Sequence, residues 1–189
     1  IYMLVLGSIY AIVLSSNILL KEEYNKTAEY LLTWPLTRSE VFFSKAAVVF
    51  LNVLVLNMVT ALAGFISMEI VQREPYSVNA FLTLSLYTLL LNLFFGAVGL
   101  FMSTLVKRSK PITTLSIGLV LILYFTYTLS KITDSLSKLG YISPFKYVNV
   151  DTLNPEYGVE LWNMLYFISL SVLLAGLSYR LYKRKNIYL

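Results

Sequence analysis

The stretch KEEYNKTAEYLLTWPLTRSEVFFSK, residues 21–45, lies between two long apolar runs and decides how the chain is organised. It holds eight of the charged residues: Lys21, Glu22, Glu23, Lys26, Glu29, Arg38, Glu40 and Lys45. Ala28, Leu31 and Leu32 form an apolar stripe within it, as in an amphipathic helix. A polar connection that carries its own helix between two apolar runs needs a reason to be folded. We therefore expect a partner to dock onto it.

The composition places the chain in a membrane. Of its 189 residues, 58% are hydrophobic and only 13% are charged, whereas a soluble domain carries about 25% charged residues. The apolar residues fall in blocks of about 20, which is the length needed to cross a bilayer. The net charge of +5 does not indicate nucleic acid, because the basic residues flank the apolar blocks. We predict a polytopic membrane protein.

Two residue types are absent and exclude some chemistry. The chain has no cysteine and no histidine, so it has no disulfide framework, no thiolate metal site and none of the commonest proton shuttles. It opens at Ile1, without a methionine and already inside an apolar run. We expect an N-terminal portion, and with it one further span, to precede this residue.

Five uncharged segments predict an all-α protein with five visible transmembrane helices, and six in the full chain. These segments are residues 1–20, 46–68, 79–106, 112–130 and 161–179. Each is long enough for a helix that crosses about 30 Å of hydrocarbon at about 1.5 Å per residue. None sustains the period-2 alternation of a membrane β-barrel. We predict a single transmembrane domain over residues 1–189, with a connecting segment at 21–45 and a second one at 131–160.

The distribution of Lys and Arg predicts the orientation, because cytoplasmic loops are enriched in both. One side carries Lys21, Lys26, Arg38, Lys45, Lys107, Arg108, Lys110, Arg180, Lys183, Arg184 and Lys185. The other carries Arg73, Lys131, Lys138 and Lys146. This asymmetry predicts that residues 21–45 and the C-terminus are cytoplasmic and that residues 131–160 face outward.

The predicted spans contain no Asp, Glu, Lys or Arg. Ion-coupled transporters and pumps usually need such groups within the membrane, so a self-powered transporter is disfavoured. The spans do contain Asn52, Asn57 and Asn92. One interpretation is hydrogen bonding between helices, at about 0.6 kcal/mol per bond; the other is a polar translocation path.

Within residues 21–45 the sequence predicts two helices. Pro35 ends the first near Thr33, because proline disfavours α geometry in the residue before it. Thr37 to Glu40 reads as a capping box that starts the second, which continues into the span from Ala46. An amphipathic helix lying flat on the bilayer is the alternative for the first helix.

The same segment resembles the signature of ABC-2 type permeases, the membrane subunits of type V ABC exporters. The matching residues are Glu22, Thr27, Glu29, Leu31, Leu32, Pro35, Leu36, Thr37, Arg38, Glu40 and Lys45, whereas Lys26 replaces a glycine usual in the family. The resemblance implies a coupling helix that rests in a cleft of an ATP-binding cassette subunit. The implied ATPase-coupling residues are Glu22, Glu23, Thr27, Glu29, Leu31, Leu32, Pro35 and Arg38.

Two weaker resemblances lie towards the C-terminus. Ser143-Pro144-Phe145-Lys146-Tyr147 resembles a stretch before the last span of such permeases, where short re-entrant helices close an outer gate. The implied gate residues are Ser143, Pro144 and Phe145, and a loop helix at the membrane interface is an equal alternative. Ahead of them, Ile132, Leu136 and Leu139 form an apolar stripe, and Gly140 is expected to stop that helix at its C-terminus. The basic tail from Tyr182 to Ile187 also resembles the end of these permeases.

The energy source is expected to be another polypeptide, because no G-x-x-x-x-G-K-[ST] motif occurs. The resemblance therefore implies a permease subunit of a bacterial ATP-driven exporter in the cytoplasmic membrane. It implies a second permease subunit in a homo- or heterodimer, with ATP and Mg on the partner and no cofactor on this chain. A non-transporting sensor or immunity subunit is an alternative. An integral membrane enzyme is a weaker one, because the outer acidic residues are widely scattered. An amphipathic or lipid-like molecule, a peptide or an antibiotic fits a path without charges.

Overall fold

The computed structural model describes residues 2–18, 37–71, 77–106, 109–132, 134–148 and 158–184. They form five α-helices and two short 3-10 helices: α1 (Tyr2–Ile18), α4 (Arg38–Val71), α5 (Val78–Leu105), α6 (Ser109–Ile132), η1 (Asp134–Ile142), η2 (Pro144–Tyr147) and α7 (Leu161–Arg184). The described residues include no strand. The protein is an all-α polytopic membrane protein, as the apolar blocks predict.

Within the described ranges, four helices are long and apolar enough to cross a membrane: α4, α5, α6 from Ile112 onward, and α7. The apolar helix α1 is shorter, with 17 residues, or about 26 Å at 1.5 Å per residue. In contrast, α4 has 34 residues and begins at Arg38. The predicted capping-box helix and the predicted span from Ala46 are therefore one continuous helix.

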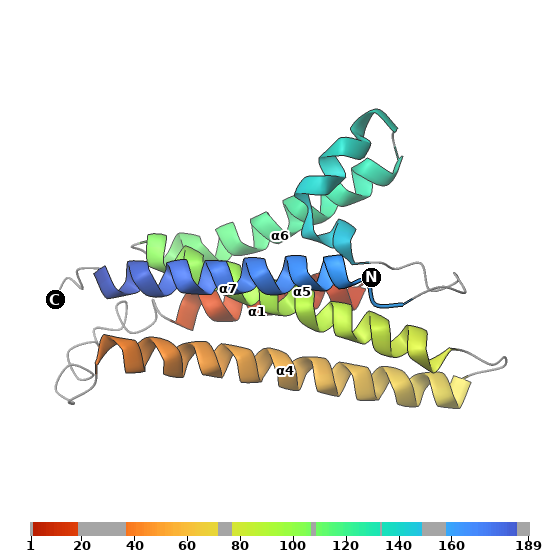
Figure 1. The fold of residues 1–189 in the computed structure, drawn as a ribbon, viewed down its shortest axis with the longest axis horizontal. Helices are drawn as coiled ribbons and strands as arrows, with labels where there is room; N and C mark the ends of the chain where they lie inside the picture. The colour runs from red at the N-terminus through yellow and green to blue at the C-terminus, as the bar shows by residue number, and fades with distance from the viewer. Residues whose placement is uncertain are drawn as a thin grey trace.

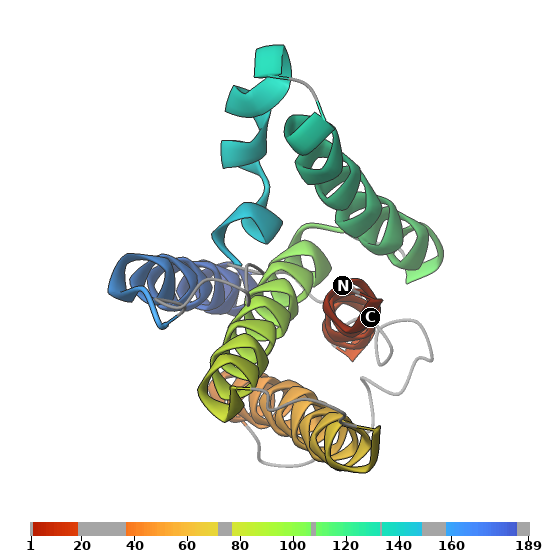
Figure 2. The same cartoon turned by 90° about the vertical axis from the view of Figure 1, so that its right-hand side faces the viewer.

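Helix α5 is the centre of the bundle. Fourteen of its residues are buried, whereas four are buried on α4 and three on α7. Tyr87, Leu91 and Phe95 on α5 are fully buried. Viewed along the bundle, α1, α4 and α7 surround α5, and α6 lies beyond α1 (Figure 2). Helices α1, α4 and α7 consequently pack mainly on α5, α6 packs mainly on α1 and η1, and broad faces are left outward.

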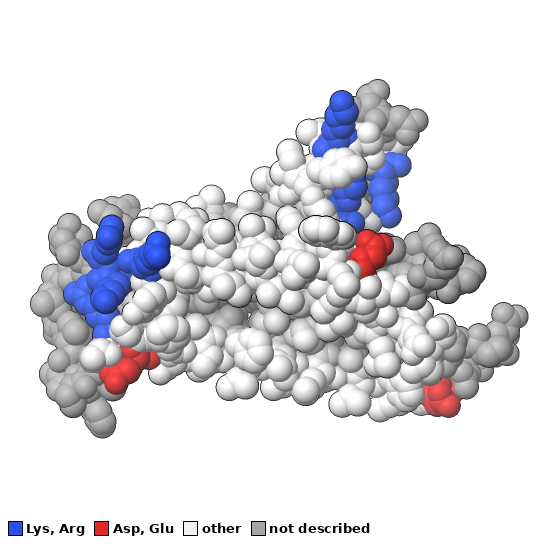
Figure 3. All heavy atoms as spheres, in the orientation of Figure 1, with Lys and Arg blue, Asp and Glu red and all other residues white. Residues whose placement is uncertain are grey.

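Those outward faces are apolar, as a lipid-facing surface requires. On α4, Leu51, Val55, Met58, Val59 and Leu62 are all exposed, and monomeric soluble proteins rarely expose a contiguous patch of this kind. Charged side chains gather at the two ends of the molecule and leave the middle of the visible face uncharged (Figure 3). The surface thus has the banding expected of helices that span a bilayer.

The second half of α6 and η1 form an arm that leans away from the bundle, and η2 returns the chain to it (Figure 1). The prediction that Gly140 stops a helix is wrong, because η1 continues through it to Ile142. A Cβ at this position would lie 2.5 Å from Ser130 Oγ, so glycine allows η1 to approach α6 closely. The predicted stripe of Ile132, Leu136 and Leu139 is exposed.

Candidate functional site

We call the end of the bundle where α4 begins and α7 ends the basic end. The charged residues there whose side chains the structure describes are Arg38, Glu40, Lys45, Arg180, Lys183 and Arg184 (Figure 3). The capping box predicted here is confirmed. The Thr37 backbone N–H and hydroxyl donate to Glu40 Oε2 at 2.7 and 2.9 Å, and the Glu40 N–H donates to Thr37 Oγ1 at 3.3 Å. The bond from the Thr37 backbone N–H lowers the pKa of Glu40 most, and the bond from the Thr37 hydroxyl lowers it further. Glu40 lies before the span predicted at 46–68.

The first turns of α4 are joined to the last turns of α7. Arg38 Nη1 donates to the Lys183 carbonyl oxygen at 3.4 Å, and the Ser39 and Tyr179 hydroxyls lie 3.0 Å apart. Phe42 is almost fully buried, with its ring centroid 5.5 Å from that of Tyr179. These contacts make the start of α4 and the end of α7 one packed unit.

Lys45 makes the corresponding link to α1. Its Nζ donates to the carbonyl oxygen of Ile18 at 2.8 Å, at the negative end of the α1 dipole. Residues 19–36 therefore connect the end of α1, which Lys45 binds, with the start of α4, which Thr37 caps. We call the contacts of Arg38, Ser39, Phe42 and Lys45 with Ile18 and α7 the α4 clamp.

The described residues include only one of the predicted ATPase-coupling residues, Arg38, and it belongs to the α4 clamp. Glu22, Glu23, Thr27, Glu29, Leu31, Leu32 and Pro35 lie outside the described residues. Sequence reasoning noticed Lys45 only as a motif residue and missed Phe42 and Tyr179 entirely. Aromatic residues near a basic tail are common at membrane–water interfaces. The sequence therefore did not distinguish Phe42 and Tyr179 from residues that only anchor a helix at such an interface.

Two of the three predicted path residues meet in the middle of the bundle. Asn92 is 1% exposed; its Nδ2 donates to Asn57 Oδ1 at 3.2 Å and its Oδ1 accepts from Ser8 Oγ at 3.3 Å. This network joins α5 to α4 and α1. Asn52 lies apart from it and donates to Val48 O of its own helix at 2.8 Å. The geometry supports hydrogen bonding between helices for Asn57 and Asn92, and a path role remains a prediction.

Replacing Asn92 with leucine should destabilise the bundle by about 1 kcal/mol, because two bonds between helices are lost at about 0.6 kcal/mol each. Asn52→Leu is the matched control, since Asn52 bonds within its own helix. The measurement is the fraction of monodisperse protein after heating in detergent. Equal losses in the two variants would mean that the network does not stabilise the packing of α1, α4 and α5.

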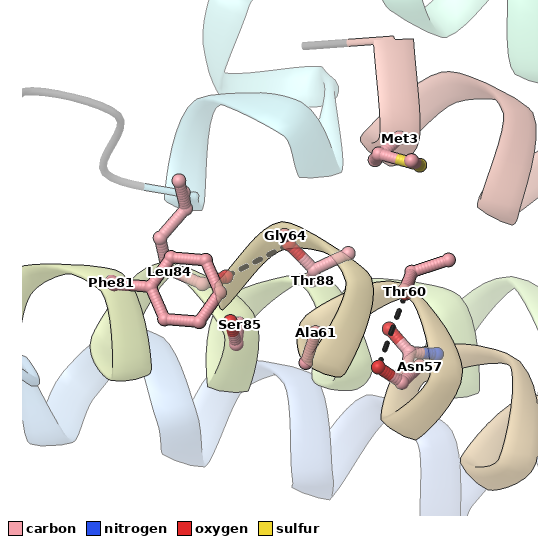
Figure 4. Close-up of a pocket in the computed structure, with 9 residues that line it drawn as sticks. All are labelled: Met3, Asn57, Thr60, Ala61, Gly64, Phe81, Leu84, Ser85 and Thr88. Atoms are coloured by element: carbon pink, nitrogen blue, oxygen red, sulfur yellow. Dashed lines mark hydrogen bonds between the residues drawn. The ribbon is translucent and has the colours of Figure 1, made fainter. Parts of the chain in front are cut away.

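A cavity of about 160 Å³ lies beside this network, between α1, α4 and α5 (Figure 4). Its lining residues are Met3, Asn57, Thr60, Ala61, Gly64, Phe81, Leu84, Ser85 and Thr88. On α4 and on α5 they follow the same spacing of i, i+3, i+4 and i+7, so one face of each helix forms a wall. A Cβ at Gly64 would lie 3.3 Å from the Phe81 ring. Nothing in the sequence predicted this cavity.

At the end opposite the basic end, the predicted gate residues are buried against α5 and α6. Ser143 Oγ donates to Leu123 O at 2.7 Å. The ring of Phe145 lies 5.6 Å from the rings of both Phe95 and Tyr124. Pro144 is also buried. The structure thus packs these three residues together against α5 and α6. Their role as a gate stays a prediction.

The chain was compared with known proteins. A family model described as ABC-2 family transporter protein matches residues 2–187. No curated protein matches the chain. The family match spans nearly the whole chain, from α1 through the α4 clamp to the end of α7.

Proposed function

The chain belongs to the ABC-2 transporter family, and from this premise we propose that it is the membrane-spanning permease subunit of an ATP-driven exporter. The sequence has no G-x-x-x-x-G-K-[ST] motif to cradle ATP phosphates. ATP and Mg would therefore bind to a separate ATP-binding cassette subunit. The basic end would face the cytoplasm of a bacterial cell, because that side carries most Lys and Arg.

The α4 clamp is the observation that carries this proposal. Residues 22–38 would receive the ATP-binding subunit, and both ends of this segment connect to the clamp. A displacement of the segment would reach α1 through the Lys45–Ile18 contact at 2.8 Å and α7 through the Arg38–Lys183 contact at 3.4 Å. Three helices would then move together, although the partner touches only the connection between two of them.

Transport would follow as alternating access. The ATP-binding subunit would bind the segment differently when closed on ATP and when open, and only such a difference in interaction energy can shift a conformational equilibrium. Two permease subunits, identical or different, would pair above two ATP-binding subunits. Asn52, Asn57 and Asn92 would contribute to the path, and Ser143, Pro144 and Phe145 would close it on the outer side.

Purification of the chain from its native membrane with its bound partners tests the proposal. We expect an ATP-binding subunit to co-purify, and its ATPase activity to rise when an amphipathic peptide or lipid cargo is added from a panel. Absence of an ATP-binding subunit from the purified complex would overturn the proposal. An ATP-binding partner whose activity responds to none of the panel would instead favour a sensor subunit over a transport subunit.

A further inference from the structure

The cavity between α1, α4 and α5 lies deep in the apolar part of the bundle. Its residues on α4 run from Asn57 to Gly64, which is roughly 10–20 Å from the end of the helix at Val71, given 1.5 Å per residue. The predicted spans 46–68 and 79–106 contain eight of its nine lining residues, and Met3 of α1 is the ninth. The cavity therefore lies at the depth expected for the hydrocarbon core of the bilayer.

Most polar groups in the lining are already bonded within the protein. Thr60 Oγ1 donates to Leu56 O at 2.9 Å and to Asn57 O at 3.1 Å. Thr88 Oγ1 donates to Leu84 O at 2.8 Å; the bonds to Asn57 and Leu84 are dashed in Figure 4. Asn57 Nδ2 donates to Val53 O at 2.8 Å, and its Oδ1 accepts from Asn92. The lining contains no charged residue. The cavity consequently presents mainly methyl, methylene and aromatic groups.

Water can bond in such a space only at the four polar lining residues, Asn57, Thr60, Ser85 and Thr88. A buried water typically makes two to four hydrogen bonds. In the part of the chain that the structure describes, Ser85 Oγ makes no hydrogen bond, and the oxygens of Asn57, Thr60 and Thr88 keep acceptor capacity beside the bonds they already make. Apolar cavities of about 150 Å³ stay dry and bind small hydrocarbons. This cavity, at about 160 Å³, is of similar size, and its other five lining residues, Met3, Ala61, Gly64, Phe81 and Leu84, are apolar.

The size of the cavity also limits the ligand. Drug-sized ligands occupy pockets of about 300–1,000 Å³. This cavity is smaller and can therefore hold only a part of such a molecule. An uncharged, narrow part with no need for hydrogen bonds is an alkyl chain. Met3 lies at the α1 side and is 58% exposed, and a methionine side chain adapts its shape easily to such a chain.

We propose that this cavity binds a hydrocarbon chain of a bilayer lipid, held between α4 and α5 and covered by Met3. The chain would supply the packing contacts that Ala61 and Gly64 leave open, since a void deprives its lining of those contacts. Binding would depend on the chain and be indifferent to the lipid headgroup, because the lining has no charge. The inference goes beyond the transport role and does not require it.

Photolabelling in nanodiscs tests the proposal. The purified complex, without ATP, is placed in phosphatidylcholine that contains a trace of phosphatidylcholine with a diazirine near the end of one acyl chain. After illumination, we expect labelled peptides from residues 57–64 and 81–88. Ala61→Phe should lose this labelling down to the background of other exposed residues, because the new ring fills the cavity. The yield should not change when phosphatidylglycerol carries the diazirine.

Ala63→Phe is the matched control, because Ala63 lies on the exposed side of the same helix and the change is identical. It should keep the labelling of residues 57–64 and 81–88. Ser85→Leu narrows the cavity from α5 and serves if Ala61→Phe does not purify as monodisperse protein; it should also reduce labelling. Uniform labelling of the outer faces, or equal yields from the lining variant and Ala63→Phe, would overturn the proposal. The readout needs no ATPase stimulation, so it separates failure of this inference from failure of the transport role.

Discussion

Replacing Leu32 with aspartate is expected to leave the chain in the membrane and to abolish ATP-driven transport. Leu32 belongs to the predicted apolar stripe of the coupling helix, together with Ala28 and Leu31. A carboxylate on that stripe would have to lose its hydration when the ATP-binding subunit covers it. Central anchor residues of interfaces cost about 2 kcal/mol or more when altered, which is about thirtyfold in affinity at 1.4 kcal/mol per tenfold.

The measurement is the amount of ATP-binding subunit that co-purifies, together with the cargo-stimulated ATPase activity. Tyr30→Asp is the matched control: it introduces the same carboxylate on the face of the predicted helix opposite the stripe and should retain both. Glu29→Arg tests the motif independently and is expected to uncouple ATP hydrolysis from transport. Normal transport by both Leu32→Asp and Glu29→Arg would show that residues 22–38 do not couple the two subunits.

The elements that could be predicted from sequence are those fixed by local or one-dimensional rules. The apolar blocks predict helices because a backbone in lipid must satisfy its own hydrogen bonds. The capping box of Thr37 and Glu40 was predictable because both partners lie within one turn, and the three hydrogen bonds confirm it. The continuity of α4 from Arg38 through Ala46 follows from the same rule, as no proline or glycine interrupts it.

The contacts that make the candidate site depend on tertiary packing and could not be derived from spacing. Lys45 reaches Ile18 across 27 positions of sequence, and Ser39 meets Tyr179 across 140. Gly140 illustrates the same limit: a glycine after a helical pattern usually indicates a helix end, but here Ser130 on another element requires it. Likewise, the cavity arises because faces of α4 and α5 align, and nothing in either face alone predicts that.

The seam between α1 and α5 is where a single added methyl group should have the largest structural effect. At Gly99 a Cβ would overlap Ser15 Oγ and lie 2.6 Å from the backbone oxygen of Ile12. The serine could rotate, but the carbonyl of Ile12 can move only with α1 itself. Ser16 and Asn17 on the same helix bond to Ser116 and Thr113 of α6, so a displaced α1 would lose those contacts as well.

Gly99→Ala is therefore expected to destabilise the bundle by up to about 3 kcal/mol, the upper end of the range for overpacking. Gly118→Ala is the matched control, because a Cβ there meets nothing within 4 Å and alanine favours a helix by up to about 1 kcal/mol over glycine. The two identical substitutions should thus shift thermal stability in opposite directions, measured as monodisperse protein remaining after heating in detergent. A Gly99→Ala variant as stable as Gly118→Ala would mean that α1 can be displaced from α5 without loss of stability. In that case the Lys45–Ile18 contact of the α4 clamp would not be made to a rigidly held helix.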